Sequence, residues 1–141
     1  MNMTNDYVVA AVAAGALIVI LLLTAIAKRL KPAKLNTTQF KKKWDNVQSL
    51  CKDKSTWPLA IINGDKLVDE ALKKRHFKGK TMGERLVAAQ HDLTDNDGIW
   101  HAHKLRNKLV HEDNLPPLKK RQVMDTLIDL RQALKDLGAL K

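Results

Sequence analysis

The sequence predicts an all-α protein, with an N-terminal transmembrane helix followed by a bundle of four main helices plus one short helix. Three observations lead to this fold class. Residues 7–27 form an uncharged apolar run, and the hundred or so residues after Pro32 place apolar side chains three and four positions apart. We find no alternating strand pattern long enough to compete with helix. The second part has the length of one compact domain.

The apolar run, YVVAAVAAGALIVILLLTAIA, has the length of a membrane span. As a helix, its 21 residues extend about 31 Å, close to the roughly 30 Å of a bilayer core. A cleaved secretory signal has a basic segment before a shorter apolar run, whereas the preceding MNMTND contains no Lys or Arg. We therefore expect an uncleaved anchor rather than a signal peptide or a buried core helix.

Cations follow this run and none precedes it. All 25 Lys and Arg lie after Ala27, and with 14 acids there residues 28–141 carry a net charge of +11. The asymmetry predicts a short extracytoplasmic tail at 1–6 and a cytoplasmic domain at 38–141, on the inner (plasma) membrane. Residues 28–37 form the basic juxtamembrane linker. We expect these cations of the linker and the next helix to meet anionic lipid headgroups: Lys28, Arg29, Lys31, Lys34, Lys41, Lys42 and Lys43.

The sequence offers no evident set of residues to bind a metal ion or a cofactor. Cys51 is the single cysteine, so neither an intrachain disulfide nor a Cys-rich metal site is possible, and this usage suits a reducing compartment. His103 and His111 share a helical stripe, but eight residues place them about 12 Å apart. Helical ligand pairs usually stand four residues apart. We expect no metal site and no cofactor.

The first half of the domain predicts two helices. Residues 38–52 follow Thr37 or Thr38 as a candidate N-cap. A second helix begins at Ser55-Thr56, with Pro58 in its first turn, and runs to about residue 75. It contains Asn63-Gly64, a dipeptide typical of turns. We expect one continuous helix nevertheless, because the apolar stripe keeps its phase across the pair.

Three helices complete the predicted bundle. Thr81 and Glu84 have the spacing of a capping box at the start of a short helix that ends near residue 90. The next helix covers about residues 96–112, with Thr94 or Asp95 as its N-cap. Pro116 and Pro117 separate it from a last helix at about 118–137, which Gly138 terminates.

The end of the 96–112 helix carries the candidate functional residues. Here LRNKLVH, with Arg106, Asn107 and His111, resembles the Arg-x4-6-His signature of the HEPN superfamily. The wider runs TWPLAIINGDKLVDEAL, KTMGERL and IWHAHKLRNKLVHE are similar to a group of short, single-pass bacterial proteins without an assigned function. This resemblance covers about residues 56–113 and implies a HEPN-like bundle. Many such domains are metal-independent ribonucleases, and others are binding modules.

The resemblance implies a role for each residue. His111 would be the general base or acid at the ribose 2′-hydroxyl, Arg106 would stabilise the charged transition state, and Asn107 would orient the phosphate or His111. A regular helix separates Arg106 and His111 by about 140° and Asn107 and His111 by only about 40°. The resemblance therefore implies a homodimer whose facing motifs share a cleft. The rival interpretation is a non-catalytic, membrane-tethered module that binds anionic lipid or a protein partner.

Overall fold

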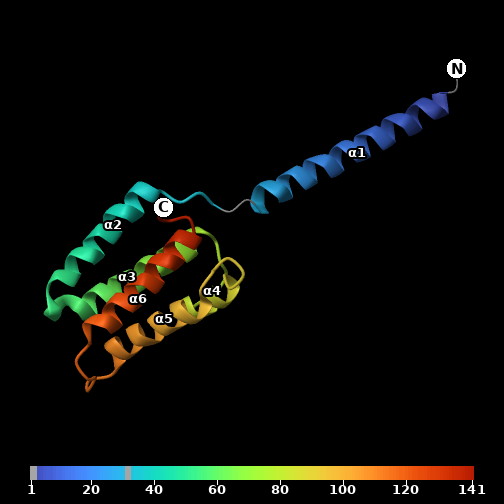
Figure 1. Ribbon diagram of the computed structural model, residues 1–141. Coiled ribbons are helices and arrows are strands. Elements are labelled where there is room, and N and C mark those ends of the chain that lie inside the picture. Colours follow the sequence, from blue (N-terminus) through green and yellow to red (C-terminus); the bar gives the residue numbers. More distant parts are fainter. Residues whose placement is uncertain (1–2, 31–32) are drawn as a thin grey trace. The chain divides into compact units, whose positions relative to one another are not determined.

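The computed structural model describes residues 3–30 and 33–141. Within these residues every regular element is a helix and none is a strand, as predicted (Figure 1). The chain divides into two units, Met1–Pro32 and Ala33–Lys141. The basic linker predicted for 28–37 falls partly in the first unit, because helix α1 continues through Lys28 and Arg29 to Leu30. Residues 31 and 32 lie outside the described residues.

The first unit is the single helix α1 (Met3–Leu30). Its segment Tyr7–Ala25 has a mean hydropathy of 2.8, and none of that window is buried. Among the described residues it is the one helix long and apolar enough to cross a membrane. A signal sequence near an N-terminus shares this length and composition, so the predicted anchor stays a prediction.

The second unit begins with α2 (Thr37–Ser49). Its N-cap is Asn36, whose Oδ1 accepts a hydrogen bond from the Gln39 backbone N–H at 3.0 Å. The predicted caps, Thr37 and Thr38, are therefore wrong by one or two residues. Two 3-10 turns, Leu50–Lys52 and Lys54–Thr56, connect α2 to the next helix.

Helix α3 (Trp57–Lys74) runs without interruption through Asn63-Gly64, as predicted. Gly64 is buried, and a Cβ atom there would lie 2.9 Å from Cδ1 of Leu130 on helix α6 (Lys120–Asp136). Side chains do not tolerate such a contact without movement. The glycine therefore allows α3 and α6 to approach closely.

The remaining helices are α4 (Met82–Ala88) and α5 (Asn96–His111). Thr81 caps α4 through its Oγ1, while the Glu84 carboxylate accepts from the Lys80 N–H at 2.6 Å. Asp95 caps α5. Beyond α6, Gly138 has a φ of +72°, and the Ala139 N–H donates to the Leu134 carbonyl at 2.8 Å. This completes the predicted glycine C-cap.

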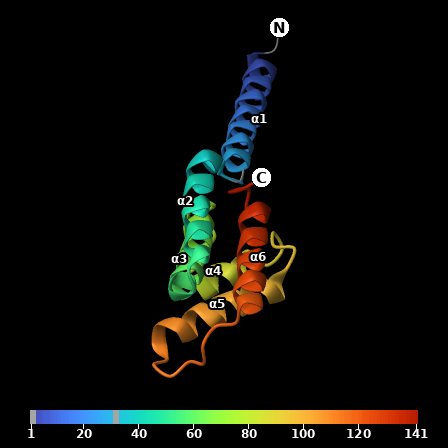
Figure 2. The ribbon, with the colours of Figure 1, turned by 60° about the vertical axis from the view of Figure 1, so that its left-hand side comes forward.

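Helix α3 is the central element of the second unit. It packs against α2, α5 and α6 and also contacts α4, while α6 packs against α5 (Figures 1 and 2). Fully buried apolar side chains from these helices fill the interior, each stabilising the fold by about 1.5–3 kcal/mol. The largest are Phe40, Ile61, Leu72, Leu86, Ile99, Leu130, Leu134 and Leu137. The bundle thus has its own core and holds α3, α4 and α5 around a shared polar surface.

Candidate functional site

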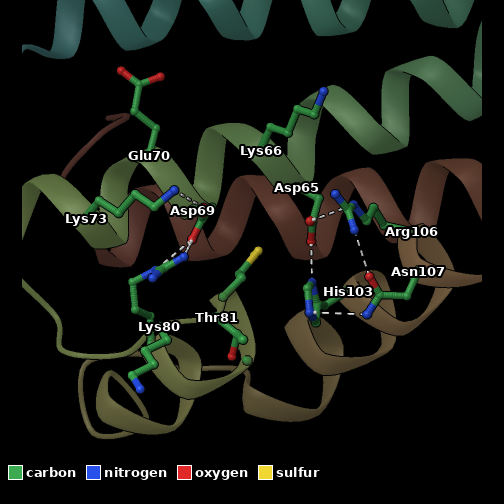
Figure 3. A pocket seen from close by; sticks show the side chains of 13 residues that line it. Asp65, Lys66, Asp69, Glu70, Lys73, Lys80, Thr81, His103, Arg106 and Asn107 are labelled. Atoms are coloured by element: carbon green, nitrogen blue, oxygen red, sulfur yellow. Dashed lines mark hydrogen bonds and ion pairs between the residues drawn. The ribbon is translucent and has the colours of Figure 1, made fainter. Parts of the chain in front are cut away.

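An open pocket of about 730 Å³ lies among α3, α4 and α5. Figure 3 shows two groups of its polar side chains in mutual contact, one around Asp65 and one around Asp69, while Lys66, Glu70 and Lys80 extend away from them. Its lining residues are Asp65, Lys66, Asp69, Glu70, Lys73, Lys80, Thr81, Met82, Gly83, Arg85, His103, Arg106 and Asn107.

Helix α3 supplies two carboxylates on one side of the pocket, Asp65 and Asp69. Four residues apart, they lie one turn from each other on the same helix face. Asp65 receives basic side chains from α5, and Asp69 receives Arg85 from α4. The two acids therefore fix the positions of α4 and α5 relative to α3.

Asp65 and three side chains of α5 form a closed polar ring (Figure 3). His103 Nδ1 lies 3.0 Å from Asp65 Oδ1, and His103 Nε2 lies 3.3 Å from Asn107 Nδ2. Arg106 Nη1 donates to Asn107 Oδ1 at 2.9 Å, and Arg106 Nε lies 3.5 Å from Asp65 Oδ2. We call Asp65, His103, Arg106 and Asn107 the four-residue ring.

The contacts of the ring define which nitrogen of His103 carries hydrogen. A carboxylate only accepts, so Nδ1–H donates to Asp65. The Asn107 oxygen is engaged by Arg106, which leaves its NH₂ group facing Nε2. Nε2 therefore acts as the acceptor in this contact. The Arg106 Nε is buried and pairs with Asp65 by charge, without a hydrogen bond.

A second acid–base contact lies one turn along α3. Arg85, a buried residue, reaches Asp69 Oδ1 with Nε at 2.8 Å and Nη2 at 2.6 Å, and its Nη1 donates to the Gly79 carbonyl. Lys73 Nζ lies 2.7 Å from Asp69 Oδ2. Burial raises the pKa of the Asp69 carboxyl, but the hydrogen bonds and charges of Lys73 and Arg85 outweigh it and hold that pKa below its ordinary value.

The pocket carries more positive than negative charge. Its lining contains five Lys or Arg and three acids, and every one of those acids contacts a basic side chain. Lys66 and Lys80 are exposed, and within residues 33–141 neither forms an ion pair. Such an excess of cations favours an anionic ligand.

The structure brings two of the three predicted catalytic residues together. Arg106 and Asn107 line the pocket and contact each other. His111 is exposed at the last residue of α5, one turn beyond Asn107, and does not line the pocket. His103, one turn before Asn107, lines it instead.

Sequence reasoning did not single out Asp65 or give His103 a role. Two signals were present. His103 shares the stripe of Asn107 and His111, and Asp65 lies three or four positions from Ile61, Ile62 and Val68 in the α3 pattern. Neither signal identifies the partner, because 38 positions separate the two residues.

The predicted lipid-facing cluster is partly engaged within the bundle. Lys41 pairs with Asp45 at 2.7 Å and Lys43 with Glu70 at 2.6 Å, whereas Lys34 and Lys42 are exposed. The side chains of Lys28, Arg29 and Lys31 lie outside the described residues.

Comparisons of the chain with protein-family models, with curated proteins and with solved structures find no match. The pocket and its chemistry are therefore the basis for assigning a function.

Proposed function

We propose that this chain is a membrane-anchored, HEPN-like helical protein that binds single-stranded RNA in the α3–α5 pocket and cleaves it without a metal ion. One observation carries the proposal. Arg106, Asn107 and an imidazole lie in one open pocket whose lining has an excess of cations.

The pocket groups suit a phosphodiester. A guanidinium offers a planar set of donors that matches phosphate oxygens and stabilises the charge that develops during cleavage. An imidazole exchanges protons near neutral pH. Cleavage by the ribose 2′-hydroxyl leaves a 2′,3′-cyclic phosphate and a 5′-hydroxyl, and it requires no metal.

A homodimer is part of the proposal. The exposed His111 lies outside the pocket of its own chain, so it reaches a phosphodiester only where a second chain presents one. The HEPN resemblance implies such facing motifs. The apolar α1, proposed as an anchor that leaves the bundle in the cytoplasm, confines two chains to one plane and raises their local concentration.

The test uses the full chain in nanodiscs of neutral lipid, incubated with a single-stranded RNA in EDTA. We expect cleavage products that end in 2′,3′-cyclic phosphate. Arg106→Ala should slow cleavage by about 100-fold or more, because it removes the donor fork. Arg121→Ala is the matched control, since Arg121 is fully solvated on α6 and outside the pocket. Absence of cleavage, or equal cleavage by the Arg106 variant, contradicts the proposal.

The rival function is a non-catalytic module that binds anionic lipid. The exposed Lys34 and Lys42 favour it, at about 1 kcal/mol per basic residue near a charged surface. In this case the full chain leaves RNA intact. The double variant Lys34→Gln with Lys42→Gln should then bind fewer anionic lipids than the natural chain when both are inserted in a mixed neutral and anionic bilayer.

A further inference from the structure

We infer that His103, oriented by Asp65, is the imidazole that accepts the 2′-hydroxyl proton in the pocket. This inference rests on the proposed RNA cleavage and assigns its proton acceptor to a residue outside the Arg-x4-6-His motif. Asp65 and Asn107 then act as positioning residues.

The geometry of His103 is that of an oriented base. Its Nδ1–H donates to Asp65 Oδ1 at 3.0 Å, which fixes the ring and leaves the Nε2 lone pair for another group. The carboxylate side chain is only 3% exposed, so its charge acts on the imidazole with little screening by water. An imidazolium formed by proton uptake is stabilised by this contact.

Helical phase places His103 with the other two pocket groups. From His103, Arg106 is rotated by about 60° and Asn107 by about 40°, so the three side chains share one helix face. His111 is about 140° from Arg106 and is exposed beyond the pocket. One chain therefore aims His103, Arg106 and Asn107 at the same place without any distortion of α5.

The Nε2 atom faces a weak partner. Asn107 Nδ2 lies 3.3 Å away, just beyond the roughly 2.7–3.2 Å range of protein N–H···O hydrogen bonds. The His103 side chain is 11% exposed and lines the pocket. A ribose hydroxyl that donates to Nε2 displaces the Asn107 amide, which remains bound to Arg106 through its oxygen.

These groups and water account for every proton transferred and every bond formed or broken in the proposed step. The 2′-hydroxyl proton passes to Nε2, and the 2′-oxygen forms a bond to phosphorus. The bond between phosphorus and the 5′-oxygen breaks, and the 5′-oxygen takes a proton from water. His103 then returns its proton to solvent, and Arg106 contacts the phosphate oxygens throughout.

The same contacts also join α5 to α3, so the test must separate structure from chemistry. His103→Asn does this, because its amide N–H takes the place of Nδ1–H toward Asp65 but offers no titratable nitrogen. His101→Asn, at an exposed position of the same helix, is the matched control. Ile61→Val, in the core, shows how cleavage responds to a modest loss of stability.

The experiment measures RNA cleavage in EDTA and thermal unfolding of the full chain in nanodiscs for each variant. We expect His103→Asn to slow cleavage by about 100-fold or more while its melting temperature stays at or above that of Ile61→Val. His101→Asn should cleave like the natural chain. His103→Gln, whose amide reaches the position of Nε2, replaces the Asn variant if that variant melts below the assay temperature.

Two failures are distinguishable. If the natural chain cleaves and folded His103→Asn cleaves within about threefold of it, the assignment of His103 is wrong and the proposed function stands. If the natural chain does not cleave RNA at all, the proposed function fails and the assignment fails with it.

Discussion

His103 Nδ1 lies 3.0 Å from Asp65 Oδ1, and this contact joins α5 to the central helix α3 inside the bundle. Asp65 is 2% exposed, so its carboxylate depends on a hydrogen bond from His103 and on the charge of Arg106 in place of contact with water. The relationship makes Asp65 a structural residue whatever the pocket binds.

Asp65→Ala should therefore destabilise the bundle by about 3 kcal/mol, because it leaves the buried His103 Nδ1–H without its acceptor and the Arg106 guanidinium without its counter-charge. Urea unfolding of the full chain in detergent, followed by far-ultraviolet circular dichroism, measures the change. Asp45→Ala, which removes an exposed ion pair with Lys41, should cost less than about 1 kcal/mol. Equal losses in the two variants would show that the ring adds nothing beyond a surface contact.

The Asp69 contacts predict a dependence of stability on pH. Lys73 and Arg85 hold the pKa of this carboxyl below its ordinary value against the opposing effect of burial. A depressed pKa in the folded chain stabilises it above the ordinary value of about 3.9, and the gain is lost as pH falls through the folded pKa. The free energy of unfolding of Asp69→Asn should thus be about 2 kcal/mol lower than that of the natural chain at pH 7.

Unfolding of the natural chain and the Asp69 variant across pH 2 to 7 provides the check. The two stability curves should separate above about pH 4 and converge toward pH 2. A constant difference across that range would mean that the side chain stabilises the fold by packing rather than by its charge.

For Gly64→Ala we expect a loss of stability, whereas helix propensity alone predicts a gain. Ala is favoured over Gly in a helix interior by about 1 kcal/mol. A Cβ at this position would lie 2.9 Å from Leu130 Cδ1 in the core, and such overpacking costs about 1–3 kcal/mol. Gly64→Ala should therefore lower the free energy of unfolding, by up to about 2 kcal/mol.

Gly83→Ala is the matched control, because its new Cβ would meet Trp100 at an ordinary 3.4 Å. That change in α4 should stabilise the chain slightly. Combining Gly64→Ala with Leu130→Val should cost less than the two single changes together, since the shorter side chain makes room. Additive losses would refute a direct clash between these two positions.

Local patterns account for most of the fold. The apolar spacing predicts every helix of the bundle, and α3 continues through Asn63-Gly64 because its buried stripe outweighs a local turn signal. The ends are less predictable. Asn36 rather than Thr37 or Thr38 caps α2, since the three residues have similar capping chemistry and the choice depends on the path of the preceding chain.

Only the part of the candidate site whose residues are neighbours in the sequence was predictable. Arg106 and Asn107 are neighbours in the sequence, and the motif finds both. The ring that holds them requires Asp65, which lies 38 positions from His103, and helical phase gives no information about that distance. The position of His111 depends on where α5 ends, a boundary that periodicity fixes only to within a turn.

The two lysines without an ion pair predict how RNA binding responds to salt. Lys66 and Lys80 line the pocket and are exposed, so each can contact a phosphate and release a counterion. Lys66→Ala and Lys80→Ala should each weaken RNA binding and reduce the slope of log affinity against log salt by about 0.7. Lys135→Ala, exposed on α6 outside the pocket, should change neither quantity. Fluorescence anisotropy of a labelled single-stranded RNA, titrated with the full chain in neutral nanodiscs at several salt concentrations, measures both. An equal effect of all three substitutions would mean that RNA binding follows overall charge and not this pocket.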